Sequence, residues 1–122
     1  MAVLEAHMAV GGLFIAINVV VGIWGLLTWR RSRPVTPLLS QLLALSHTLA
    51  LLQGAFGLYL LAGGYRAPVQ LHYVYGLLPS AAVLFGYSAR TADGRRNLLQ
   101  FSIIAFVIAG LGTRAFMTGR GM

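Results

Sequence analysis

The chain has 122 residues, of which 58% are hydrophobic and only 9% are charged, and its net charge is +7. A soluble domain of this size carries about a quarter charged residues, so nine basic and two acidic side chains cannot cover so much apolar surface. The composition excludes an ordinary soluble fold. The arginines lie between and at the ends of apolar runs, which is typical of membrane topology and not of nucleic-acid binding.

The apolar residues fall into four runs that cover residues 8–29, 38–62, 71–89 and 98–117. Each run is long enough to cross a hydrocarbon core of about 30 Å as a helix. Lipid offers the backbone no hydrogen-bond partners, so runs of this kind form helices. The connectors are short, and neighbouring helices must therefore be antiparallel. The predicted fold is an all-α integral membrane protein, a single domain over residues 1–122 with an up-down-up-down bundle of four transmembrane helices.

The ends of the runs predict the topology. The start of the chain lacks the basic region of a signal peptide and contains Glu5, so we expect the first run to be retained as a helix. Connectors 30–37 and 90–97 hold six of the nine arginines, which are Arg30, Arg31, Arg33, Arg90, Arg95 and Arg96. Arginine-rich short loops face the cytoplasm. We therefore expect a multi-pass protein of the plasma (inner) membrane, with both termini extracytoplasmic and its helices in contact with membrane lipids.

A first candidate site lies in the middle of the predicted bundle. In the second run, small and polar residues recur at helical spacing, which favours close packing against other helices. His47 belongs to this face, and an antiparallel hairpin places Asn18 at nearly the same depth. A histidine inside the membrane could bind a cofactor, relay a proton or bond a quinone carbonyl. The structural alternative is a neutral His47 that bonds to Asn18 and holds two helices together.

A second candidate site lies at the predicted extracytoplasmic interface. The topology brings seven polar or aromatic residues to this end of the bundle: Glu5, His7, Arg66, His72, Tyr73, Tyr75 and Arg114. His7 and His72 could ligate haem b, with arginines on the propionates. A quinol head group is the other possibility, with His72 or Glu5 accepting its protons. The structural alternative is an interfacial network in which Glu5 pairs with Arg114 or Arg66. No metal-ligand spacing is present.

Three functions remain open on these residues. We expect first an accessory or structural subunit of a larger membrane complex, most plausibly of a respiratory or photosynthetic electron-transfer chain. The second is a small redox protein that binds haem b or a quinone at the extracytoplasmic interface. The third is a small transporter or channel, with His47 as its titratable group. The chain has no cysteine, and its two carboxylates, Glu5 and Asp93, lie at opposite ends of the predicted bundle, so we do not expect an enzyme.

Overall fold

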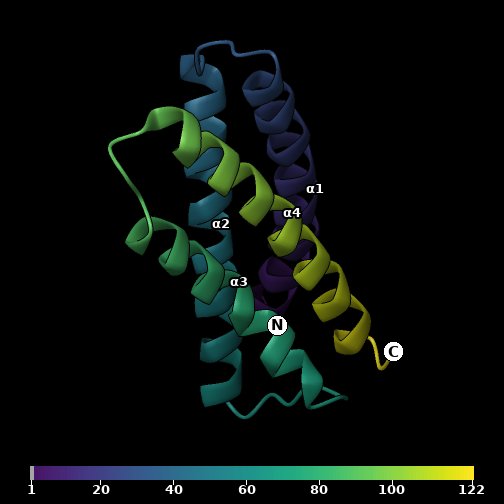
Figure 1. The fold of residues 1–122 in the computed structure, drawn as a ribbon. Helices are drawn as coiled ribbons and strands as arrows, with labels where there is room; N and C mark the ends of the chain where they lie inside the picture. The colour runs from purple at the N-terminus through teal and green to yellow at the C-terminus, as the bar shows by residue number, and fades with distance from the viewer. Residues whose placement is uncertain (1) are drawn as a thin grey trace.

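A computed structural model describes residues 2–122 of the chain, and they form four helices joined by short connectors (Figure 1). The helices are α1 (Ala2–Arg30), α2 (Pro37–Ala62), α3 (Leu71–Ser88) and α4 (Gly94–Gly119). They run alternately up and down, which confirms the predicted all-α bundle. Three of them, α1, α2 and α4, are long and apolar enough to cross a membrane. By length and composition, the chain is therefore a small multi-span helical membrane protein.

Two helices begin earlier than the apolar runs. Helix α1 begins at Ala2 where the run begins at residue 8, because its polar residues Glu5 and His7 still suit a helix. Helix α4 begins at Gly94 where the run begins at residue 98, because Asp93 caps it. The Asp93 carboxylate accepts hydrogen bonds from the backbone nitrogens of Arg95 and Arg96.

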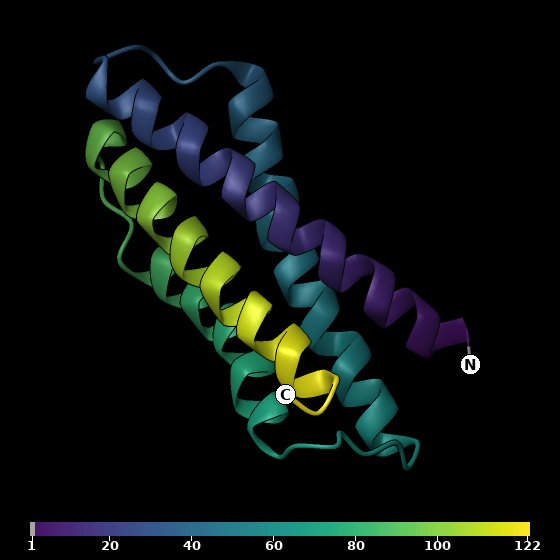
Figure 2. The same ribbon diagram turned by 90° about the vertical axis from the view of Figure 1, so that its right-hand side faces the viewer.

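Each helix contacts two neighbours around the bundle. Helix α1 packs on α2 and α4, and α3 also packs on α2 and α4, whereas α2 and α4 barely touch across the diagonal. The most extensive interface joins α1 to α4, the first and last helices of the chain (Figure 2). Glycines on both helices allow this contact. The ring of Phe106 lies against Gly22, and the side chain of Phe14 lies against Gly112.

The apolar core runs through the middle of the bundle and toward the end that carries connectors 31–36 and 89–93. Its largest cluster contains Phe14, Leu49, Ala50, Val83, Phe101, Ile104 and Ile108, and a second cluster of Val21, Leu39, Leu98 and Ala105 lies nearer that end. At that end, Arg95 of α4 donates to the backbone oxygen of Trp29 at 2.8 Å and stacks on its ring, with 4.8 Å from Cζ to the ring centroid. This arginine therefore ties α4 to α1.

The opposite end of the bundle carries connector 63–70, the start of α1 and the end of α4 (Figure 1). The chain turns there at Gly64, whose φ of +94° is accessible to glycine without strain. The distribution of arginines predicts that this end is extracytoplasmic.

Candidate functional site

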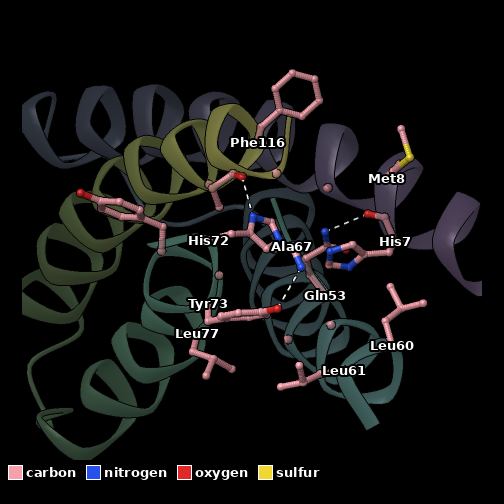
Figure 3. Close-up of a pocket in the computed structure, with 18 of the residues that line it drawn as sticks. His7, Met8, Gln53, Leu60, Leu61, Ala67, His72, Tyr73, Leu77 and Phe116 are labelled. Atoms are coloured by element: carbon pink, nitrogen blue, oxygen red, sulfur yellow. Dashed lines mark hydrogen bonds between the residues drawn. The ribbon is translucent and has the colours of Figure 1, made fainter. Parts of the chain in front are cut away.

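A cavity of about 300 Å³ occupies the end of the bundle that carries connector 63–70 (Figure 3). All four helices contribute to its wall. Six of its lining residues are glycines: Gly11, Gly54, Gly57, Gly76, Gly112 and Gly119. The second run's small face predicted close helix packing, and Gly54 does lie against Ser80 of α3. Side chains of neighbouring helices likewise fill the space beside Gly11, Gly112 and Gly119, whereas a Cβ at Gly76 would meet nothing within 4 Å.

Five residues of the predicted interfacial site line this cavity: His7, Arg66, His72, Tyr73 and Tyr75. The imidazoles of His7 and His72 meet edge to face, with 6.1 Å between ring centroids and 85° between ring planes. The Tyr73 hydroxyl accepts a hydrogen bond of 2.9 Å from the backbone nitrogen of Ala67, which fastens connector 63–70 to α3.

The other two predicted residues, Glu5 and Arg114, do not line the cavity. Glu5 is exposed on the first turns of α1 and forms no salt bridge with Arg66 or Arg114, so the ion pair of the structural alternative is not present. Arg114 instead stacks on the Tyr75 ring, at 5.8 Å from Cζ to the centroid. The topology placed these groups at one end of the bundle, but the rotation of α1 and α4 about their axes turns them away from the cavity.

Gln53 also lines the cavity, although it was not among the predicted site residues. Its side-chain nitrogen crosses from α2 to α1 and donates to the backbone oxygen of His7 at 2.8 Å. Gly11 makes room for this bond, since a Cβ there would lie 2.8 Å from the Gln53 nitrogen. Gln53 belongs to the small and polar face of the second run, which indicated that it points into the bundle but not toward which helix.

Two buried polar atoms at the cavity have no hydrogen-bond partner within residues 2–122. They are Nδ1 of His7 and Oε1 of Gln53. Most buried polar side-chain atoms in folded proteins are paired, because an unpaired one loses its hydration without compensation. Both lie in a wall that is otherwise mainly apolar, and Figure 3 shows their side chains close to His72. The cavity therefore offers a few convergent polar groups inside an apolar lining, which is the usual form of a small-molecule site.

His47 and Asn18 do not form the hydrogen bond of the structural alternative. His47 Nδ1 lies 2.9 Å from the Tyr87 hydroxyl on α3, and its ring packs on Phe101 of α4 at 5.0 Å between centroids. Asn18 is fully buried and donates to the backbone oxygen of Phe14 within its own helix at 2.8 Å. The two residues share a depth, but they do not face each other.

Asn18 provides a test of this arrangement, because its Oδ1 is buried and finds no partner among residues 2–122. Replacement of Asn18 by leucine, which has a similar shape, should leave the free energy of unfolding unchanged or raise it by about 1 kcal/mol, since an unpaired acceptor is removed. Asn18→Ala should instead lower it by about 2 kcal/mol or more, because it leaves a cavity in the core. Thermal unfolding in detergent would measure both. A larger loss for Asn18→Leu than for Asn18→Ala would contradict this account.

Comparison with known proteins adds no family to this description: no family model matches the chain, and no curated protein or solved structure is significantly similar to it. The class of this protein therefore follows from its own fold and cavity. It is a small multi-span helical protein with an internal cavity at one end.

Proposed function

We propose that this protein binds a lipid-soluble molecule with a compact polar head, of the quinone class, in the cavity beside connector 63–70. The observation that carries the proposal is the pair of unpartnered buried atoms, His7 Nδ1 and Gln53 Oε1, in a mainly apolar cavity. A ligand that brings one or two hydrogen-bonding groups would satisfy these atoms, and its ring would contact the apolar wall.

The side chains at the rim of the cavity favour a ligand that enters from the lipid. Large apolar side chains that line the cavity are also strongly exposed on the outside of the bundle. They include Met8 on α1, Leu58 on α2, Leu77 on α3 and Phe116 on α4, which are 60%, 52%, 45% and 42% exposed. In a membrane these side chains contact acyl chains, so the apolar tail of a ligand would remain in lipid while its head enters the cavity.

The size of the cavity favours a quinone over haem b. Small-molecule sites range from about 300 to 1,000 Å³, and this cavity of about 300 Å³ lies at the lower limit. That volume suits a single six-membered ring better than a porphyrin macrocycle. The edge-to-face contact of His7 with His72 also brings the two rings directly together, whereas axial ligands must bind opposite faces of a macrocycle.

The proposal is tested by purification of the protein in a mild detergent or in lipid nanodiscs, followed by solvent extraction and mass spectrometry. We expect a stoichiometric quinone or quinol in the extract. After delipidation, duroquinone or duroquinol (the tetramethyl-benzoquinone pair) should bind saturably and raise the unfolding temperature, because a ligand that binds only the folded state stabilises it. The absence of any bound amphiphile, together with no saturable binding of either compound, would refute the proposal.

The accessory-subunit hypothesis from the sequence is compatible with this role, since a quinone site can serve a larger electron-transfer complex. The exposed apolar side chains of α1 to α4 do not favour a protein partner by themselves, because lipid requires the same surface. Copurification with electron-transfer subunits would support the hypothesis, and a stable monomer that retains its ligand would oppose it. We propose binding rather than catalysis by this chain alone.

A further inference from the structure

We propose that the cavity binds the reduced, hydroxyl-bearing form of its ligand, a quinol, more tightly than the oxidised quinone. This inference rests on the proposed function and specifies the ligand further. Its basis is that two polar atoms of residues in the cavity wall, Gln53 Oε1 and His72 Nε2, can only accept hydrogen bonds, so they pair with a hydroxyl but not with a carbonyl.

The Gln53 amide has only one chemically consistent orientation. Its nitrogen lies 2.8 Å from the backbone oxygen of His7, and a carbonyl oxygen can only accept, so the nitrogen must be the atom that faces it. The amide oxygen, Oε1, is therefore the unpartnered buried atom. An amide oxygen has no hydrogen, and it can only accept a bond from a ligand.

The tautomer of His72 is fixed in the same way. Its Nδ1 lies 2.8 Å from the backbone oxygen of Ala115 on α4, so Nδ1 must carry the hydrogen. In a neutral imidazole the other ring nitrogen, Nε2, is then the acceptor. Gly119 allows this close approach of the ring to α4, because a Cβ there would lie only 3.0 Å from Cε1 of His72.

The backbone of α3 also contains a carbonyl oxygen that lacks its usual helical donor. Pro79 lies inside α3 and has no N–H, so it cannot donate to the carbonyl oxygen of Tyr75, its usual acceptor one turn earlier. Both residues line the cavity. The donors of the cavity lie near connector 63–70: the exposed Arg66 donates to the backbone oxygens of Leu61 and Tyr65, and the Tyr73 hydroxyl, which accepts from Ala67, can still donate its own hydrogen. His7 can act as donor or acceptor, so it does not favour either form of the ligand.

These acceptors discriminate between two ligands of nearly equal shape. A quinol hydroxyl donates to Gln53 Oε1 or to His72 Nε2, whereas a quinone carbonyl only accepts and leaves both atoms unpaired beside its own lone pairs. The cost of an unpaired buried acceptor corresponds to roughly a tenfold to hundredfold loss in affinity. We therefore expect duroquinol to bind at least about tenfold more tightly than duroquinone.

The test compares the two compounds on the full chain in nanodiscs, with duroquinol kept reduced under anaerobic conditions and binding followed by thermal shift and by calorimetry. Tighter binding of duroquinol supports the inference. Equal or tighter binding of duroquinone overturns it but leaves the proposed function intact. Failure of both compounds to bind overturns the proposed function, and the inference with it.

A pair of matched variants tests the origin of the preference. Gln53→Leu removes the acceptor, so the quinol-to-quinone affinity ratio should fall toward one, a change that a merely structural loss of the α1–α2 bond would not produce. Gln41→Leu makes the same substitution on an exposed position of α2 outside the cavity, and it should retain the ratio of the unmodified protein. An unchanged ratio in Gln53→Leu would show that Gln53 does not select the reduced form.

Discussion

Replacement of Gly112 by alanine should destabilise the bundle by about 1–3 kcal/mol, the usual cost of overpacking a tight interface. Gly112 is buried where α4 crosses α1. A Cβ at this position would lie 2.6 Å from Cζ of Phe14 and 3.0 Å from Cγ1 of Ile15. Both neighbours lie in the closely packed α1–α4 contact, so at least one of them must move. Unfolding in detergent, followed by the fluorescence of Trp24 and Trp29 or by circular dichroism, would measure the loss.

Gly110→Ala is the matched control for this prediction. It lies two residues earlier on the same helix and makes the same change, but its Cβ would meet nothing within 4 Å. Alanine is a better helix former than glycine, so this variant should be neutral or slightly more stable. Phe14→Leu should partly relieve the strain of Gly112→Ala, so the two losses should not add. Equal stability of the two alanine variants would contradict the packing described for α1 and α4.

Replacement of Gly76 by leucine should abolish ligand binding without unfolding the protein, with an affinity loss of about a hundredfold or more if the side chain takes the space of the ligand's ring. Gly76 lines the cavity, and a Cβ there would meet nothing within 4 Å. The new side chain can therefore extend into the cavity without displacing the helices. Binding of duroquinol, measured as the shift in unfolding temperature, is the readout.

Gly110→Leu controls for the substitution itself. It adds the same side chain to an exposed position of α4 that does not line the cavity, and both variants gain the same helix propensity. Gly110→Leu should bind as the unmodified protein does. Undiminished binding in a folded Gly76→Leu variant would place the ligand elsewhere on the protein.

Much of the interfacial site could be predicted from sequence because depth along a helix follows directly from residue number. His7, Arg66, His72, Tyr73 and Tyr75 lie at one end of the bundle in any up-down arrangement of these runs, and the structure brings all five to one cavity. The rotation of each helix about its axis could not be predicted in this way. Glu5 and Arg114 share the depth of the site but lie outside the cavity wall, and Gln53 joins it.

The same distinction between depth and rotation explains why the neighbours of His47 could not be predicted. Residue numbering placed it level with Asn18, but the side chains that surround a position depend on which helices are neighbours and how each is rotated. Its ring contacts both Tyr87 of α3 and Phe101 of α4, which are distant in sequence. The α1–α4 interface could not be predicted either, because no short connector joins these two helices; their contacts, such as Phe14 and Phe106 against glycines and Arg95 on Trp29, join residues far apart in the chain.

The amino-acid sequence by itself predicted that the apolar runs face lipid, how many helices form and that these helices alternate in direction. These properties follow from local hydropathy and from the length of the connectors, which need no knowledge of distant contacts. Only the tertiary structure decided which helices share the largest interface, which polar groups face one another and where glycines leave a cavity. Those features depend on the fit of side chains from segments far apart in the chain, and that fit fixes Gln53 and His72 as acceptors in the cavity wall.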